Sequence, residues 1–154
     1  MKQGLAIGLI GSDSAAYQRA DAVARIPGAH LVAVADHDEA AAQKLAHVYN
    51  QSHSNSKGRP AVRCVRTPQE LAHDPSIDAI ILHTAPVHNE ALGLACIGAR
   101  KHVLVQPPLA ASVAACDRLA QAAASAPVQL GVSFMMRYSP AALLARVARW
   151  LHAE

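Results

Sequence analysis

The chain has 154 residues, enough to bury one substantial core but too few for a dinucleotide-binding domain together with a full substrate domain. Its formal charge is only +3, its basic residues are scattered and 3% of its residues are aromatic, so no nucleic-acid partner is expected. The sequence lacks an apolar run long enough to cross a membrane and the apolar segment of a secretion signal. Residues 1–154 are therefore expected to form one cytoplasmic domain with no membrane partner.

Six short apolar runs alternate with segments of helical periodicity along the chain. The runs predict strands over residues 5–10, 30–35, 61–65, 79–84, 102–106 and 128–133. Helical patterns follow the first strand and then cover residues 39–49, 68–73, 89–100, 112–124 and 140–152, the last as a C-terminal amphipathic helix. The polar residues 51–60 interrupt the pattern and are predicted to form a mobile loop.

This alternation predicts an α/β fold. Parallel strands need crossover connections, and the intervening helices supply them. We expect a doubly wound, Rossmann-like parallel sheet of six strands in the order 3-2-1-4-5-6, with helices on both faces. Ligands of such sheets bind outside the carboxyl ends of the strands, where the strand order reverses. That point would gather residues 12–14, 36, 84–86 and 106–108 around one crevice.

The turn after the first strand carries an altered form of the dinucleotide-binding pattern G-x-G-x-x-G/A. Gly11 and Ala16 fit the first and third positions, but Asp13 occupies the second. Asp36 ends the second strand twenty positions after Ala16, where such a unit keeps the acid that binds the ribose. The predicted cofactor-binding residues are Gly11, Ser12, Asp13, Ser14, Ala16, Asp36, Thr84, Pro86 and Gln106.

Asp13 leaves two interpretations open. A carboxylate about 5 Å from a phosphate charge, at an effective dielectric constant of about 20, repels it by about 3 kcal/mol, on the order of a hundredfold in affinity. Alternatively, Asp13, flanked by Ser12 and Ser14, caps the following helix and satisfies its first amides without a cofactor. NAD is therefore expected to bind weakly or not at all.

No catalytic or metal site is predicted. Ser12 and Ser14 lack an obvious base and are interpreted as caps, while His83 and His88 have poor metal-ligand spacing across a strand end. The cysteines lie in apolar contexts without a Cys-x-x-Cys pair, as expected of buried thiols in a reducing compartment: Cys64, Cys96 and Cys116.

Over nearly its whole length, the sequence resembles the N-terminal domain of the Gfo/Idh/MocA oxidoreductases. The resemblance is carried, in order, by residues 7–11, 24–29, 31–36, 74–78, 101–105 and 137–140. It implies a domain that binds NAD or NADP and works with a second α/β domain, which holds a sugar or polyol that gives a hydride to the nicotinamide. By the same resemblance Asp36 would favour NAD, because its carboxylate accepts from a ribose 2′-hydroxyl and repels a 2′-phosphate.

The sequence departs from the family at functional positions. The family's Glu-Lys-Pro motif is here Gln106-Pro107-Pro108, so the lysine that helps to orient substrate and nicotinamide is absent. The family's Thr-Pro-Asn-x-x-His stretch corresponds to residues 84–89 of this chain. When the two are aligned without a gap, His88 is displaced by one position from the family's histidine. The domain that carries the family's catalytic Asp and His is not in this chain.

Three functions remain open, and the substrate cannot be read from the sequence. The first is a shortened oxidoreductase domain that still binds a nicotinamide dinucleotide weakly and is inactive alone. The second is a non-catalytic Rossmann-like interaction module, a pseudoenzyme whose cofactor site is lost or reused. The third is a half-enzyme completed by a separate substrate-domain partner.

The C-terminal strand and helix are also expected to mediate self-association. With no second domain to cover them, these apolar side chains would form an exposed patch: Phe134, Met135, Leu143, Leu144, Val147, Trp150 and Leu151. A symmetric homodimer would cover it, whereas the alternative is a helix that folds back onto its own sheet edge.

Overall fold

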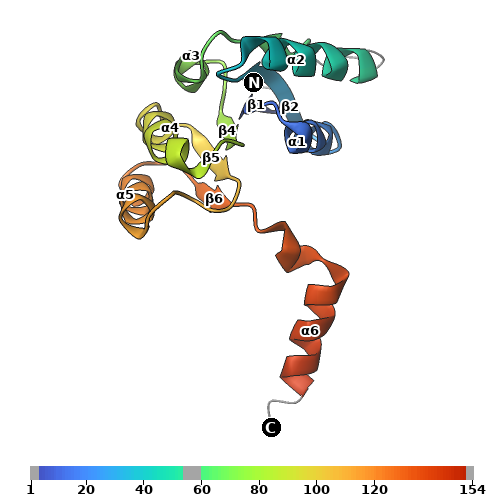
Figure 1. The fold of residues 1–154 in the computed structure, drawn as a ribbon, viewed down its shortest axis with the longest axis vertical. Coiled ribbons are helices and arrows are strands. Elements are labelled where there is room, and N and C mark those ends of the chain that lie inside the picture. Colours follow the sequence, from blue (N-terminus) through green and yellow to red (C-terminus); the bar gives the residue numbers. More distant parts are fainter. Residues whose placement is uncertain (1–3, 54–59, 152–154) are drawn as a thin grey trace.

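The computed structural model describes residues 4–53 and 60–151, in which six parallel strands form one sheet. Figure 1 shows how the helices and strands are arranged. The strand order is β3-β2-β1-β4-β5-β6, so the predicted topology is confirmed. The strands are β1 (Leu5–Ile10), β2 (Ala29–Ala35), β3 (Arg63–Cys64), β4 (Ala79–Leu82), β5 (His102–Val105) and β6 (Leu130–Val132). The helices are α1 (Ser14–Ala24), α2 (Glu39–His53), α3 (Pro68–His73), α4 (Pro86–Gly98), α5 (Val113–Ala124), the 3-10 helix η1 (Met135–Tyr138) and α6 (Pro140–Leu151).

Helices cover both faces of the sheet, as the sequence predicts. On one face, α1 and α2 pack onto a core that contains Leu9 and Val34. On the other face, α3, α4 and α5 pack onto a core that contains Ile10 and Leu82. Adjacent residues of β1 thus point into different cores, and this burial on both sides explains why its sequence is an uninterrupted apolar run.

Two helices extend beyond their predicted bounds. The helix α2 continues through residues 51–53, the first part of the expected loop, and the His53 ring stacks on Tyr49 with centroids 4.3 Å apart. Residue 60 follows as irregular chain, and residues 54–59 of that loop lie outside the described residues. The helix α4 begins at Pro86 rather than at residue 89, because proline is well suited to the first helical turn.

The C-terminal helix leaves the body of the domain. After β6 the chain forms η1, and α6 packs against η1 and projects from the sheet instead of folding back onto its edge (Figure 1). We call its exposed side chains, together with those before it, the C-terminal apolar surface: Phe134, Met135, Met136, Leu143, Leu144 and Val147. The side chains of Trp150 and Leu151 lie outside the described residues, as does residue 152. None of the described helices is long and apolar enough to span a bilayer.

Candidate functional site

Gly11 directly follows β1 and begins the turn into α1. Its φ angle is +116°, a region that residues with a side chain rarely adopt. A Cβ atom at this position would lie 2.0 Å from the carbonyl oxygen of His83, which follows β4. The glycine therefore permits two neighbouring strand ends to meet closely at the predicted crevice.

Asp13 is the N-cap of α1, as one of the two interpretations predicts. Its Oδ1 accepts hydrogen bonds from the backbone amides of Ala15 and Ala16 at 2.9 and 3.0 Å. Partial burial raises the pKa of the Asp13 carboxyl, but the Ala16 amide and the contact with His83 outweigh it, and the pKa lies below its ordinary value. Asp13 is therefore an anion that occupies the amides at the start of α1.

His83 connects Asp13 to a polar network at the ends of β4 and β5. Nε of Arg19 lies 3.0 Å from Nδ1 of His83 and can only donate, so Nδ1 accepts. The proton of the neutral ring is thereby placed on Nε2, which donates to Oδ1 of Asp13 at 2.6 Å. Arg19 also donates from Nη2 to Oε1 of Gln106 at 2.9 Å.

Sequence reasoning missed Arg19 and considered His83 only as a metal ligand. Both nitrogens of His83 are taken by Asp13 and Arg19. The available signal was the position of Arg19 on α1, three residues after the buried Ala16, because such spacing brings a long side chain near the same helix face. His88 lies elsewhere, against His37, with ring centroids 5.4 Å apart.

Asp36 directly follows β2, and each of its carboxylate oxygens accepts one hydrogen bond within the chain. Oδ2 accepts from the Ser12 hydroxyl at 2.6 Å, and Oδ1 accepts from the Asp38 amide at 3.1 Å. The structure therefore brings Ser12 and Asp36 together, and a ribose hydroxyl would share the carboxylate with Ser12, because each carboxylate oxygen can accept two hydrogen bonds.

Thr84 and Pro86 take part in the junction between β4 and α4. The Thr84 hydroxyl donates to Oδ1 of Asn89 at 2.6 Å, and Nδ2 of the fully buried Asn89 donates to the Pro108 carbonyl at 3.2 Å. Asn89 thus ties this junction to the chain after β5, a structural role that the sequence analysis did not assign.

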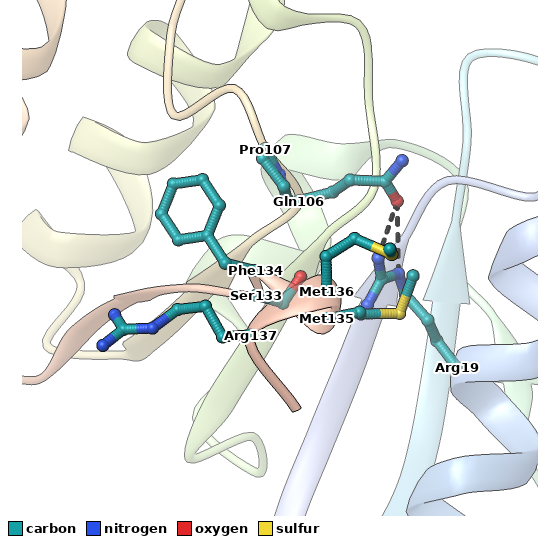
Figure 2. Close-up of a pocket in the computed structure, with 8 residues that line it drawn as sticks. All are labelled: Arg19, Gln106, Pro107, Ser133, Phe134, Met135, Met136 and Arg137. Atoms are coloured by element: carbon teal, nitrogen blue, oxygen red, sulfur yellow. Dashed lines mark hydrogen bonds between the residues drawn. The ribbon is translucent and has the colours of Figure 1, made fainter. Parts of the chain in front are cut away.

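A cavity of about 520 Å³ opens beside Gln106, at the carboxyl ends of β5 and β6 (Figure 2). Pro107, Ser133 and the residues of η1 form much of its wall. Among the described residues no group of three or more His, Cys, Asp or Glu side chains is placed to hold a metal ion.

The residues at the turn fit a dinucleotide only in part. Gly11 and Asp36 stand where the predicted site needs them, yet the amides of Ala15 and Ala16, which would meet a phosphate at the helix N-terminus, are bonded to Asp13. A pyrophosphate therefore does not fit this arrangement unless the Asp13 side chain moves.

Comparisons with known proteins agree with the fold. The model of the Gfo/Idh/MocA oxidoreductase family, NAD-binding Rossmann fold, matches residues 5–134. The chain is 34% identical over 139 residues to an inositol 2-dehydrogenase of Acidothermus cellulolyticus. The aligned residues make up 89% of this chain and 38% of that protein.

Solved structures give the same result. An NAD-binding oxidoreductase from Klebsiella pneumoniae superimposes on this chain with a TM-score of 0.80 and 32% sequence identity. The superposition covers 96% of this chain and 39% of the Klebsiella chain. Biliverdin reductase from Synechocystis, in complex with biliverdin and NADP+, superimposes with a TM-score of 0.76 and 27% sequence identity. The superposition covers 86% of this chain and 39% of the reductase chain. The chain spans less than two fifths of the length of each of these three relatives. On the family match over residues 5–134, the chain belongs to the Gfo/Idh/MocA oxidoreductases and comprises an NAD-binding Rossmann domain of that family.

Proposed function

We propose that this domain is the nucleotide-binding part of a dehydrogenase whose phosphate site is closed by its own Asp13, so that NAD binds weakly. The observation that carries this proposal is the pair of hydrogen bonds from the Ala15 and Ala16 amides to Oδ1 of Asp13. A phosphate would have to displace a carboxylate from these amides and then remain beside its charge. The proposed cofactor is NAD rather than NADP, because Asp36 would repel a 2′-phosphate.

The chain alone is proposed to be catalytically inactive. It has Pro107 where the family has a lysine, and it spans a minor part of the relatives' length. The inositol 2-dehydrogenases among the relatives support a polyol as the substrate class of the whole protein. The three free cysteines support a cytoplasmic location.

Titration of NADH into the purified chain, followed by nicotinamide fluorescence, tests the closed phosphate site. Asp13→Gly is expected to bind NADH about ten- to a hundredfold more tightly than the wild type, because it removes both the charge and the occupant of the amides. Asp13→Asn keeps a capping side chain without the charge and should give a smaller gain. Asp117→Asn, which removes an exposed carboxylate from α5, is the matched control and should change nothing.

Micromolar binding of NADH by the wild type, with no gain in Asp13→Gly, would overturn the proposal.

A second candidate function, the non-catalytic interaction module, is favoured by the hydrogen-bond network that joins Asp13, His83, Arg19 and Gln106. This network fills the crevice with the chain's own polar groups. Failure of both Asp13→Gly and Asp13→Asn to bind NADH at all would select that candidate. The third, a half-enzyme, is favoured by the exposed C-terminal apolar surface, which a separate substrate domain would cover.

A further inference from the structure

The exposed carboxylate of Asp13 is held by a buried histidine. The Asp13 side chain is 66% exposed, whereas that of His83 is only 2% exposed. Nε2 of His83 lies 2.6 Å from Oδ1 of Asp13, which also accepts from the Ala15 and Ala16 amides, and no other described residue accepts from Nε2. Movement of Asp13 away from these amides would leave a buried N–H without its protein partner, which is unfavourable. The bond to His83 therefore opposes opening of the cap.

Arg19 determines whether His83 can hold Asp13 at all. A neutral imidazole ring carries one N–H, and only the tautomer protonated on Nε2 can donate to the Asp13 carboxylate. The other tautomer would direct a lone pair at that carboxylate and an N–H at the guanidinium. Because Nε of Arg19 donates to Nδ1 of His83 at 3.0 Å, it selects the tautomer that bonds Asp13.

The guanidinium of Arg19 is fixed in turn by the residue that follows β5. Its Nε and Nη2 both donate to Oε1 of Gln106, at 3.2 and 2.9 Å, and Figure 2 shows this pair of bonds. The chain of hydrogen bonds thus has a cation at one end, the neutral His83 ring in the middle and the Asp13 carboxylate at the other end. Hydrogen bonds in such a chain polarise one another, and a charged group at either end strengthens them.

We propose that His83 and Arg19 are positioning residues that hold Asp13 closed over the first amides of α1 and so control access to the phosphate site. The inference rests on the proposed function, in which these amides are that site. It adds that a residue 70 positions away from Asp13, outside the turn itself, determines how firmly the site is closed. Because His83 acts through Asp13, its influence on NADH binding should disappear once the Asp13 carboxylate is removed.

Nitrogen NMR of the His83 ring tests the role of Arg19 without any cofactor. At a pH where the ring is neutral, the wild type should show the tautomer protonated on Nε2, and Arg19→Leu should show a mixture of both tautomers. Arg25→Leu removes an exposed cation from the end of the same helix and should leave the tautomer unaltered. A wild-type ring protonated on Nδ1, or the same tautomer in Arg19→Leu as in the wild type, would contradict the role given to Arg19.

Amide hydrogen exchange tests whether His83 holds the cap. In His83→Ala, exchange at Ala15 and Ala16 should be about tenfold faster than in the wild type, because the carboxylate that bonds these amides is released. His83→Gln retains an N–H that can donate to the carboxylate and should restore most of the protection. The amide of Leu9 within the sheet reports on the whole fold and should change much less. Unchanged exchange at the two alanines, or equal acceleration at Leu9 in both His83 variants, would refute a positioning role.

NADH titration then measures the effect on the phosphate site. His83→Ala should bind NADH about three- to tenfold more tightly than the wild type, a smaller gain than in Asp13→Gly because the charge of Asp13 remains. In the Asp13→Gly background the same substitution should change the affinity by less than about twofold. An equal gain in both backgrounds, or weaker binding in His83→Ala, would show that His83 acts on the cofactor directly and overturn the inference. If Asp13→Gly itself gains nothing, the proposed function fails, while the tautomer and exchange measurements still decide whether His83 and Arg19 position Asp13.

Discussion

Asp74 shows how one carboxylate stabilises this fold through local contacts. Its side chain is 16% exposed and accepts from the Arg63 guanidinium, the Ser76 amide and the Ser76 hydroxyl. Partial burial raises the pKa of the Asp74 carboxyl, but these contacts outweigh it and hold the pKa at about 2, against 3.8 for an unperturbed carboxyl. The difference corresponds to about 2 kcal/mol of stability for the ionised group.

Asp74→Asn is therefore expected to lower the free energy of unfolding at pH 7 by about 2 kcal/mol. Since the pKa is lower in the folded state, the carboxylate stabilises fully above about pH 5, and this contribution disappears as the pH falls from about 4 to 2. Urea denaturation at several pH values measures both effects. Asp117→Asn should differ from the wild type by less than about 0.5 kcal/mol throughout. A deficit in Asp74→Asn that persists at pH 2 would contradict the electrostatic origin.

Single residues of the site were predictable where the signal is local. The capping role of Asp13 follows from its type and its place before a helix, and the structure confirms it. The partners of Asp13 and Arg19 were not predictable, because His83 is 70 residues from Asp13 and Gln106 is 87 residues from Arg19. Only the packing of three sequence-distant segments at the carboxyl ends of the strands brings these groups together, and no local preference encodes it.

At the level of elements, the turn between β1 and α1 depends on Gly11. Gly11→Ala combines a positive φ angle with a clash of 2.0 Å against the His83 carbonyl oxygen, and should destabilise the domain by more than about 3 kcal/mol. Gly28→Ala has a φ angle of +78° but no atom within 4 Å, so about 1 kcal/mol is expected. Gly98→Ala, in open space on α4, should be neutral or slightly stabilising. Thermal unfolding of the three variants gives the order, and a Gly11→Ala variant as stable as Gly28→Ala would disprove the close approach.

Element bounds were predicted best where capping residues mark them. Thr67 and Ser112 each accept a hydrogen bond from the third amide that follows, and the helices α3 and α5 occupy their predicted ranges. The helix α4 begins three residues before its predicted start, and no capping residue marks that start in the sequence, since its N-cap Ala85 makes no side-chain capping bond. The helix α2 continues past its predicted end, because the contact between Tyr49 and His53 lies within a polar segment whose composition is typical of a loop.

For the whole molecule, the strand order could be predicted because apolar runs and helical segments alternate without exception in the described chain. The direction of α6 could not, because its amphipathic pattern fits either its own sheet edge or another surface. In the structure α6 projects from the body, with Leu144 70% exposed and Val147 54% exposed (Figure 1). We therefore propose that the C-terminal strand and helix form a symmetric homodimer interface.

The C-terminal apolar surface then decides the oligomeric state of the chain in solution. Apolar side chains from η1 and α6 lie on one continuous segment, and pairing it with the same segment of a second copy removes both surfaces from water at once. Sedimentation equilibrium should give twice the monomer mass of 16.1 kDa. Leu144→Glu should shift the equilibrium towards monomer by at least tenfold, because it places a charge within the buried surface. Ala145→Glu adds the same charge on the opposite side of α6 and should leave the dimer intact, so dissociation by both variants, or a soluble wild-type monomer at high concentration, would rule out this interface.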